Sequence, residues 1–517
     1  MPLSGAPLAG PVRIHDLLRQ GLAASPNGPA IVSMDESWSW TELEEKTNRL
    51  ASTYLALGLR PGDRVASLMP NRIALIGHYL ACLKAGLVPT PLNYRYTPPE
   101  IDHALTVSGA RMMLAHIERA SDIKASKAAS LPLGVITSGG EDASNRSLEG
   151  LLRTDPRRST LPEREPPAPA VIFFTSGSTG PAKGVTHSVE SLGWLIASAA
   201  AAFELTPGDI VLPGSSCSHI SAFGMSLAAL SAGARAVVAR RFDHAELGPL
   251  MRKTRPTLLS MLPTALLNLL REKGTTAEDF ASLRLVRSGG DKVPAELEKE
   301  FHALTGHFVS EGYGLTETGI AARNPPSGRD KLGSIGTPSP GFAFSIRDAD
   351  GREVAQGEEG RLWLKSRTLM AGYWNDPRAT AEVEKDGWFD TGDVMKADED
   401  GYLWFCGRQK QIIVHDGSNI APQEVEDALL EHPAVESAGV VGIHDLMHGE
   451  NVRAYVALRP DVPKPTAAEL IQFARARVGY KAPEEIVFLD AMPLNATGKV
   501  DRARLKALAA GDHAHAV

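Results

Sequence analysis

Eleven residues from Thr175 to Val185, TSGSTGPAKGV, have the composition of a loop that binds a polyphosphate. Glycines let backbone N–H groups turn toward an anion, while hydroxyls and a lysine add donors and a positive charge. The members with these properties are Thr175, Ser176, Gly177, Ser178, Thr179, Gly180, Lys183 and Gly184. The stretch is not a Walker A loop, which would require glycine at Ala182 and a hydroxyl at Gly184. An ordinary glycine- and serine-rich turn is the plainer alternative.

A second stretch, SEGYGLTETG at residues 310–319, combines an aromatic ring with a hydroxyl and a carboxylate. Tyr313 lies between two glycines, so its ring can stack on a purine without obstruction from neighbouring side chains. Thr316 offers a hydroxyl, and Glu317 offers a carboxylate that can hold Mg²⁺ on phosphates. A tyrosine in a turn beside a solvated glutamate is the alternative interpretation.

Three further stretches carry weaker signals when each is taken alone. Asp393 in the DTGD turn at 390–393 has a carboxylate that can accept hydrogen bonds from a ribose diol. Residues 407–413, GRQKQII, are basic, and Lys499 lies in the NATGKVDR stretch at 495–502. A turn residue, a basic linker and an exposed lysine would explain these features without function.

Composition and charge restrict the class of protein. The chain has 517 residues with 43% hydrophobic and 22% charged residues, which is enough for more than one hydrophobic core. The net charge is -7, and no basic block with interleaved aromatics occurs, so nucleic acid is not expected as a partner.

The cysteines and the N-terminus bear on location. Cys82, Cys217 and Cys406 are isolated, which indicates a reducing compartment and no disulfide framework. The N-terminus has no secretory pattern, so the cytoplasm is expected. The most apolar segment, 73–92, contains histidine, lysine and two prolines, which favours a buried helix and strand over an integral membrane segment.

The elements that must position these residues alternate between helix and strand. Ser39 and Glu42 have capping-box spacing ahead of a helical pattern that ends at Gly58. The expected strands are 63–69, 86–89, 171–174, 236–238, 258–261, 283–286 and 307–309, and the expected helices include 74–84 and 263–270. This alternation predicts an α/β fold with largely parallel sheets.

The pattern changes in the last third of the chain. Short strands and many glycines at 333–405 predict a small antiparallel or β-barrel-like subdomain. Helices at 422–430 and 467–478 and strands at 438–442, 453–458 and 485–489 predict a compact α+β tail. We therefore expect an N-terminal domain at 1–406 with two stacked α/β sub-layers, followed by a separate small domain at 412–517.

The order and spacing of the five stretches resemble the adenylate-forming superfamily of acyl-CoA synthetases, firefly-type luciferases and peptide-synthetase adenylation domains, over nearly the whole chain. The resemblance implies nucleotide contacts from the residues at 175–180 and Lys183, and from Ser288, Gly289, Gly290, Glu311, Gly312, Tyr313, Gly314, Asp393 and Arg408. It implies Lys499, Thr316, Glu317 and His219 as catalytic residues, Glu317 as the metal ligand, and Gly417, Ser418 and Asn419 as the acceptor loop. It also implies a hinge at 407–411, with Lys410 as the hinge residue, and a mobile small domain at 412–517. His219, Phe223, Gly289 and Gly314 would line the acyl pocket.

The implied reaction joins a hydrophobic or aromatic carboxylic acid to CoA through acyl-AMP, with ATP, Mg²⁺ and CoA, by rotation of the small domain. YKAP at 480–483 resembles a motif of CoA ligases, and the pocket walls at 216–224 and 288–291 contain no arginine or lysine, which argues against a dicarboxylate. The alternatives are transfer of the same adenylate to an amine or to a carrier-protein thiol. A non-catalytic nucleotide- or acyl-AMP-binding module and a homodimer also remain open.

Overall fold

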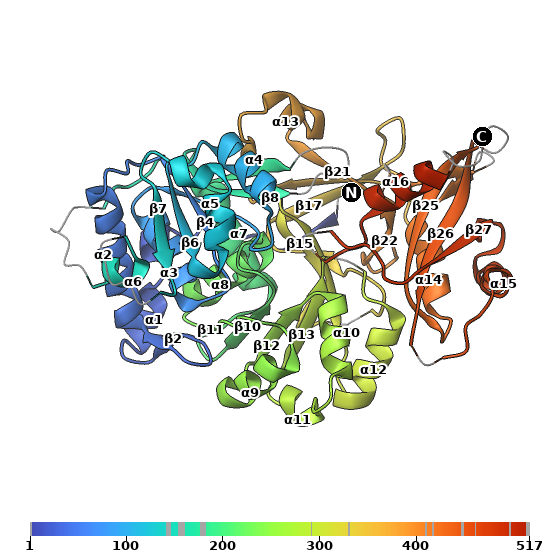
Figure 1. The fold of residues 1–517 in the computed structure, drawn as a ribbon, viewed down its shortest axis with the longest axis horizontal. Helices are drawn as coiled ribbons and strands as arrows, with labels where there is room; N and C mark the ends of the chain where they lie inside the picture. The colour runs from blue at the N-terminus through green and yellow to red at the C-terminus, as the bar shows by residue number, and fades with distance from the viewer. Residues whose placement is uncertain are drawn as a thin grey trace. The chain divides into compact units, whose positions relative to one another are not determined.

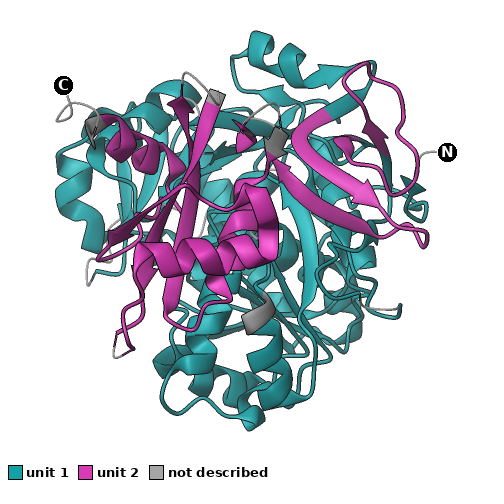
Figure 2. Ribbon diagram, turned by 90° about the vertical axis from the view of Figure 1, so that its right-hand side faces the viewer, with its two compact units in different colours: residues 1–344, 364–389 teal, residues 345–363, 390–517 magenta. Residues whose placement is uncertain are grey.

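The computed structural model describes residues 3–140, 146–153, 161–175, 182–290, 292–328, 331–408, 411–415, 418–445, 449–460, 462–495 and 498–512. The chain divides into two compact units, coloured separately in Figure 2. Unit 1 comprises residues 1–344 and 364–389, and unit 2 comprises residues 345–363 and 390–517. Each unit is described by itself.

The largest sheet of unit 1 has the order β16-β15-β14-β13-β12-β10-β11-β2-β3 within the described residues. The strands from β14 to β2 pair in parallel, and β16, β15 and β3 add antiparallel edges. Their bounds are β2 Pro29–Val32, β3 Ser37–Ser39, β10 Ile210–Gly214, β11 Arg235–Val237, β12 Leu258–Met261, β13 Leu285–Gly289, β14 Ser310–Leu315, β15 Gly319–Arg323 and β16 Thr337–Pro338. Parallel pairing of buried strands confirms the α/β prediction.

Helices cover this sheet with apolar side chains. Figure 1 shows α9 (His244–Thr254), α10 (Pro263–Arg271), α11 (Ala277–Phe280) and α12 (Ala295–Thr305) gathered around β12 and β13. Leu259 and Val286 from the strands pack with Leu266 and Phe301 from the helices in one core cluster. Helices α7 (Val189–Ala202) and α8 (Ile220–Ser231) contribute to a second, larger cluster.

A second parallel sheet, β5-β4-β6-β7, supplies the other α/β layer of unit 1. Its strands are β4 Arg64–Leu68, β5 Val88–Pro91, β6 Met112–His116 and β7 Val135–Ser138, and helices α2 (Trp40–Ala56) and α3 (Ile73–Lys84) belong to this part of the chain. The capping box between Ser39 and Glu42 begins α2 as predicted. Helix α3 is almost entirely buried, and no helix of the described residues is long and apolar enough to cross a membrane.

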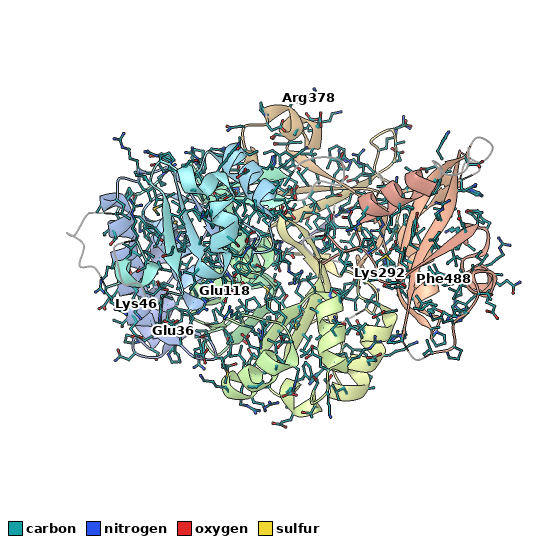
Figure 3. The ribbon with its side chains drawn as sticks, in the orientation of Figure 1. Glu36, Lys46, Glu118, Lys292, Arg378 and Phe488 are labelled. Carbon is teal, nitrogen blue, oxygen red and sulfur yellow. The ribbon has the colours of Figure 1, made fainter. Side chains whose placement is uncertain are left out.

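Edge strand β3 is fastened to the rest of unit 1 by a buried tryptophan. The indole N–H of Trp38 donates to Glu36 Oε1 at 2.6 Å, and the Lys46 ammonium lies 4.4 Å from the centre of its ring. Figure 3 labels these two charged residues at the edge of the unit. The flanking charges keep this edge strand from presenting an uncovered apolar side chain.

A third sheet of unit 1 is antiparallel and has the order β19-β9-β8. Strand β8 (Pro169–Thr175) contains the expected strand at 171–174, and β9 (Lys183–Ser188) returns beside it. Strand β19 (Gly372–Tyr373) pairs with β9 from far along the sequence. The polyphosphate-type stretch is therefore the connection of a β-hairpin.

Six short strands pair in the order β1-β17-β18-β21-β20, with β22 on β21. Their bounds are β1 Leu3–Ser4, β17 Phe342–Arg347, β18 Gly360–Ser366, β20 Glu384–Lys385, β21 Trp388–Ala397 and β22 Leu403–Arg408, and the division between the units falls within β17, β18 and β21. Among the described residues these strands form no closed barrel, contrary to the barrel-like expectation. The strands at the two ends of the order have only 2 residues each, too few to extend the pairing into closure.

The C-terminal part of unit 2 is an α+β layer. Strands β23 (Ile413–His415), β24 (Ser418–Ile420), β25 (Val435–Asp445), β26 (Gly449–Leu458) and β27 (Glu485–Leu489) form one sheet, with β27 parallel to β26. Helices α14 (Pro422–Leu430) and α15 (Ala467–Val478) share a core cluster with it, and α16 (Arg502–Asp512) places Leu505 against Val441 and Tyr455. The expected bounds of α14, α15 and β27 agree with those observed.

Candidate active site

The β8–β9 hairpin fixes the two ends of the polyphosphate-type stretch. Thr175 and Lys183 are direct partners across the antiparallel pair, and the Lys183 side chain is exposed. Residues 176–181, which include Ser176, Gly177, Ser178, Thr179 and Gly180, lie outside the described residues. His103 Nε2 lies 2.8 Å from the carbonyl oxygen of Ala182, so α4 (Pro98–Ser108) anchors the returning chain.

The second stretch forms strand β14 and its turn, rather than a loop after a strand at 307–309. Tyr313 is 9% exposed. A Cβ on Gly314 would lie 2.1 Å from the carbonyl oxygen of Gly319, so the close approach of β14 and β15 requires glycine there. Glu311 is buried and its Oε1 accepts a hydrogen bond from the backbone of Val293 at 3.2 Å.

A buried histidine on β9 holds the turn that carries Thr316. His187 is fully buried, and its Nε2 lies 2.8 Å from the carbonyl oxygen of Thr316. Because a carbonyl only accepts, this nitrogen carries the proton. Burial lowers the pKa of His187 to about 4, so the imidazole is neutral at pH 7.

The segment before β19 holds the same turn from the other side. Thr368 Oγ1 donates to the carbonyl oxygen of Thr318 at 3.0 Å, and the Met370 N–H donates to the carbonyl oxygen of Glu317 at 2.7 Å. The backbone of residues 316–318 is thus fixed by hydrogen bonds from two distant parts of unit 1. A fixed backbone restricts where the Glu317 carboxylate can point.

Tyr373 joins the hairpin to this turn. Its hydroxyl donates to Glu317 Oε1 at 2.9 Å, and the Lys183 ammonium lies 4.8 Å from the centre of its ring. Burial, followed by the Glu317 charge, raises the pKa of Tyr373 well above its ordinary value, so the phenol remains a donor. One half-buried side chain therefore contacts both a cation and a carboxylate that the sequence assigned to phosphate and metal binding.

The predicted acyl-pocket residues on α8 have different surroundings. His219 is the N-cap residue of α8 and is partly exposed. Phe223 is fully buried, and its ring centre lies 5.2 Å from that of Phe173 and 5.1 Å from that of Tyr79. These contacts make Phe223 a core residue in this arrangement, and its role in an acyl pocket stays a prediction.

The opposite predicted wall, residues 288–291, begins at the end of β13, and Asp291 lies outside the described residues. Ser288 is buried, and its hydroxyl donates to the carbonyl oxygen of Met261 at 2.9 Å. Gly289 pairs with Gly312 on β14, and a Cβ on Gly289 would lie 2.4 Å from the carbonyl oxygen of Gly312. Gly290 has φ +87°, a conformation that favours glycine. The wall is therefore made of backbone.

In unit 2, the β21–β22 register joins the two residues assigned to the ribose. Asp393 and Arg408 are direct partners across the antiparallel pair, and Arg408 Nε lies 3.0 Å from Asp393 Oδ1. Asp393 is fully buried, and its N–H donates to Thr391 Oγ1 at 3.1 Å. A neighbouring cation holds this carboxylate, and the turn hydrogen bond fixes the backbone that carries it.

Lys499 follows a tight turn in unit 2. The Asn495 N–H donates to the Lys499 carbonyl at 2.8 Å, and the Lys499 N–H donates to Asn495 Oδ1 at 3.1 Å. Gly498 has φ +84°, which allows the turn. The turn presents Lys499 at a defined position of unit 2.

Other predicted residues of unit 2 are only partly described. Lys410 and Gly417 lie outside the described residues, so the hinge and the domain boundaries stay predictions. The backbone of Ser418 and Asn419 belongs to β24, paired with β23. In the YKAP stretch, the Lys481 ammonium lies 2.7 Å from Glu424 Oε2 and ties this stretch to α14.

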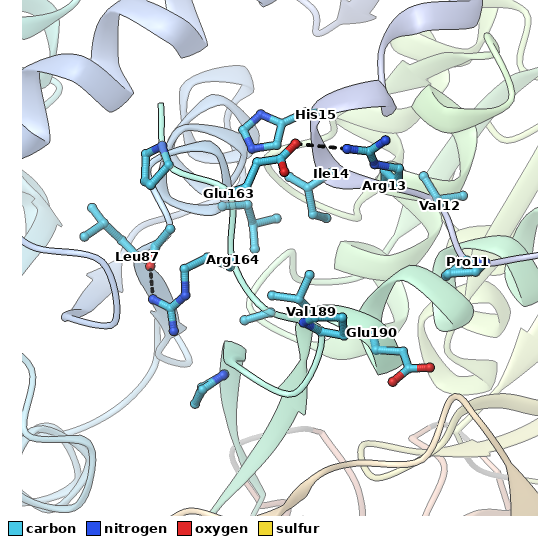
Figure 4. Close-up of a pocket in the computed structure, with 16 residues that line it drawn as sticks. Pro11, Val12, Arg13, Ile14, His15, Leu87, Glu163, Arg164, Val189 and Glu190 are labelled. Atoms are coloured by element: carbon cyan, nitrogen blue, oxygen red, sulfur yellow. Dashed lines mark hydrogen bonds and ion pairs between the residues drawn. The ribbon is translucent and has the colours of Figure 1, made fainter. Parts of the chain in front are cut away.

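A cavity of about 260 Å³ lies elsewhere in unit 1 (Figure 4). Its lining is mostly apolar and includes Pro169 and Ala170 at the start of β8 and Val189 at the start of α7. Thr175 ends the same strand, roughly 20 Å farther along at about 3.3 Å per residue. None of the predicted site residues lines this cavity.

Glu317 suits a magnesium ion carried by a polyphosphate. Its carboxylate is half-buried beside the Lys183 end of the hairpin, and no group of three or more potential metal ligands occurs among the described residues. Mg²⁺ on a nucleotide typically takes one or two protein carboxylates and keeps phosphate and water oxygens as its other ligands. Among the described residues, Glu317 therefore fits a Mg²⁺ ion bound together with ATP.

Three residues of the site, His187, Thr368 and Tyr373, were not predicted from the sequence. All three lie outside the five stretches, and each matters through a hydrogen bond to the turn at 316–318. The sequence does contain the Gly372-Tyr373 pair, an aromatic residue directly after a glycine. That signal is too common to indicate a site by itself.

Comparisons with known proteins agree with this organisation. The AMP-binding enzyme family model matches residues 18–374, and the AMP-binding enzyme C-terminal domain model matches residues 424–499. A feruloyl-CoA synthase from Amycolatopsis sp is 33% identical over 92% of this chain and 95% of that protein. The fatty acid–[acyl-carrier-protein] ligase ScoC from Streptomyces coeruleorubidus is 33% identical over 95% of each chain. The anthranilate CoA ligase AuaEII, solved with anthranoyl-AMP, has a TM-score of 0.89 and 25% identity over 99% of each chain.

The fold and the hairpin site, formed by Lys183, Glu317 and Tyr373 beside the β8–β9 hairpin, thus define an adenylate-forming enzyme of the acyl- or aryl-CoA ligase type. The chain belongs to the AMP-binding enzyme family, with the family's two regions matched in order. ATP, Mg²⁺ and CoA are the reactants and metal of this class of ligase.

Proposed function

We propose that this chain activates a hydrophobic or aromatic carboxylic acid as acyl-AMP and transfers the acyl group to CoA. The observation that supports this most directly is the double contact of Tyr373 with Lys183 and Glu317. It gathers a cation for phosphates and a carboxylate for Mg²⁺ around one side chain. A pure structural turn has no need of both charges beside a polar hairpin connection.

Each segment has a separate task in the first half-reaction. The loop from Thr175 to Lys183 binds the β- and γ-phosphates, and Tyr313 stacks on adenine. Asp393 accepts hydrogen bonds from the ribose, with Arg408 beside it. Glu317 holds Mg²⁺, which when bound supplies positive charge that offsets the charge of the phosphates.

The acid then displaces pyrophosphate. A carboxylate oxygen forms a bond to the α-phosphorus of ATP, and the bond from that phosphorus to the bridging oxygen of the β-phosphate breaks. Lys499 donates to the carboxylate and the α-phosphate, where negative charge accumulates. His219 borders the acid carboxylate.

The second half-reaction transfers the acyl group. The CoA sulfur, having lost its proton, attacks the carbonyl carbon of the acyl-AMP, and AMP leaves with the electrons of the carbon–oxygen bond. Rotation of the C-terminal domain about Lys410 withdraws Lys499 and brings the loop at 417–419 to the acyl-AMP.

We place the enzyme in the cytosol because its three cysteines are isolated in the sequence.

A carrier-protein thiol is the second candidate acceptor. The ScoC ligase, at 33% identity, carries the name of a carrier-protein ligase, so similarity of this degree does not separate the two acceptors. YKAP at 480–483 favours CoA. Transfer to an amine uses the same acyl-AMP and has no particular support from the described residues.

A panel of acids tests the proposal. The protein is incubated with ATP, Mg²⁺ and benzoates, cinnamates, dicarboxylates or medium-chain fatty acids, and pyrophosphate is measured with and without CoA. We expect acid-dependent pyrophosphate, and a CoA thioester when CoA is present. Pyrophosphate without thioester would redirect the proposal to another acceptor, and no pyrophosphate with any acid would favour a non-catalytic binding module.

Lys499→Ala separates the two half-reactions. We expect adenylation to fall by about a hundredfold or more, the range lost when a charge-stabilising donor is removed. Thioester formation from supplied acyl-AMP should change far less, because Lys499 acts before the rotation. Equal losses in both half-reactions would contradict the rotation mechanism.

A further inference from the structure

Arg287, on β13 of unit 1, is a buried cation without an anionic partner among the described residues. The residue is 5% exposed, and one of its terminal nitrogens donates to the hydroxyl of Ser260 at 3.2 Å. Its Nε has no hydrogen-bond partner, and its guanidinium carbon lies 5.9 Å from the centre of the Phe203 ring. Burial lowers the pKa of Arg287 to about 10, with no neighbouring carboxylate to oppose the shift.

Such a group is unusual because burial of an unpaired charge is costly. Buried arginines normally pair with carboxylates or with several carbonyl oxygens. Arg284, on the same segment of chain, follows this rule, since its Nε lies 2.8 Å from Asp209 Oδ1. Within the described part of the chain, Arg287 bonds to one neutral hydroxyl instead, and its Nε is available to a ligand.

The guanidinium lies beside two glycines of the predicted site, Gly289 of the acyl pocket and Gly312 of the nucleotide contacts. Residues 287 and 289 lie on the same face of β13, because side chains alternate along a strand. Nη2 of Arg287 lies 3.0 Å from the position that a Cβ on Gly289 would take, and Nε lies 3.1 Å from the position of a Cβ on Gly312. Arg287 therefore lies against the predicted wall at 288–291, directly before its first residue, although that wall itself contains no cation.

We propose that the acid activated by this chain carries a second oxygen acceptor, and that Arg287 binds it. The class comprises carboxylic acids with a further carboxylate, sulfonate or phenolic oxygen. Of these second groups, an acidic one also offsets the buried charge of Arg287. This inference rests on the proposed function and replaces the expectation that the pocket disfavours a second acidic group.

The structural alternative assigns Arg287 to the end of helix α7. Phe203 is the C-cap residue of α7, and Arg323, opposite Gly312 on β15, donates to the carbonyl oxygen of Ala202. A cation near a helix C-terminus is stabilising. If Arg287 had this task, its removal would destabilise the protein whatever the acid.

Three variants decide between these tasks. Arg287→Met keeps a long apolar side chain and removes the charge, Arg287→Lys keeps a charge without the planar fork, and Arg284→Met is the matched control at a paired arginine. For each, the thermal midpoint is measured without ligands. The rate of pyrophosphate release is then measured with matched acids that differ only in a second carboxylate, sulfonate, phenol or hydrogen.

For the wild-type protein we expect a preference for one of the oxygen-bearing acids over its unsubstituted partner. Arg287→Met should lower kcat/KM for that acid by about tenfold to a hundredfold, the worth of a hydrogen bond to a charged group, and should change kcat/KM for the unsubstituted acid far less. Arg287→Lys should recover part of the preference. The thermal midpoint of Arg287→Met should equal or exceed the wild-type value, whereas Arg284→Met should lower it without a change of preference.

Different failures have different meanings. If the wild-type protein prefers unsubstituted acids, or if Arg287→Met keeps the wild-type preference, the inference is wrong while the proposed function stands. A large fall in the thermal midpoint of Arg287→Met would assign Arg287 to the end of α7 and overturn the inference. If no acid releases pyrophosphate, the proposed function itself fails.

Discussion

Tyr373→Phe is the substitution that best isolates one contact of the hairpin site. It removes the hydroxyl that donates to Glu317 at 2.9 Å and keeps the ring that lies 4.8 Å from the Lys183 ammonium. A hydrogen bond to a charged group contributes about 1.5–3 kcal/mol, and loss of a partner behind a metal-binding side chain typically costs about 10–100-fold in metal affinity. We therefore expect the Mg²⁺ concentration for half-maximal adenylation to rise about tenfold or more.

The assay is a Mg²⁺ titration of acid-dependent pyrophosphate release at saturating ATP and acid. Direct binding of a non-hydrolysable ATP analogue over the same Mg²⁺ range, without acid, gives a second readout that does not depend on turnover. Tyr94→Phe is a matched control, because the Tyr94 hydroxyl donates to Glu118 at 2.8 Å in the same kind of contact away from the hairpin. The control should leave the Mg²⁺ dependence unchanged.

Tyr373→Leu completes the series by removing the ring as well. Loss of the cation–π contact with Lys183, worth about 0.5–1 kcal/mol at an exposed site, should add a rise in the KM for ATP that Tyr373→Phe does not show. A wild-type Mg²⁺ dependence in Tyr373→Phe would refute the positioning of Glu317 by this hydroxyl. Identical behaviour of the Phe and Leu variants would refute the separate contribution of the ring.

Further predictions concern acid stability and the core. Burial lowers the pKa of His187 to about 4, below the ordinary unfolded value of about 6.5. As the pH falls, the unfolded chain therefore takes up a proton before the folded protein does. The free energy of unfolding falls by about 3 kcal/mol between these two pH values. The thermal midpoint of His187→Gln should therefore fall less than the wild-type value between pH 7 and pH 4.5, and parallel falls would contradict this. Phe223→Ala should lower the free energy of unfolding by about 3–5 kcal/mol, measured by denaturant unfolding, because it leaves a cavity beside Phe173 and Tyr79. A small loss of stability with a shift toward larger acids would instead place Phe223 in the acyl pocket.

Local sequence patterns sufficed for several elements of the fold. The strand at 258–261 and the helices at 422–430 and 467–478 have the observed bounds, because caps, prolines and apolar spacing act within a few residues. Strand β14 was placed too early, at 307–309, because Gly312 and Gly314 make residues 310–315 resemble a loop. These two glycines are required by close contacts with β13 and β15, which no local sequence pattern contains.

The charged residues of the candidate site could be predicted from the sequence, but the residues that hold them in position could not. Lys183, Glu317 and Asp393 carry chemistry that their residue types indicate. Tyr373 lies 56 residues from its partner Glu317, so its importance arises only when β19 pairs with β9. Arg287 looks like an ordinary strand residue until the fold shows that no carboxylate of the described residues accompanies it.

The β8–β9 pairing has a consequence for the entropy of nucleotide binding. Since Thr175 and Lys183 are partners in the ladder, the two ends of their connection meet when the protein folds. The entropic cost of closing that connection is met at folding and does not recur at each binding event. A substitution that weakens this ladder without changing a predicted contact residue would transfer this cost to the nucleotide and appear as weaker ATP binding.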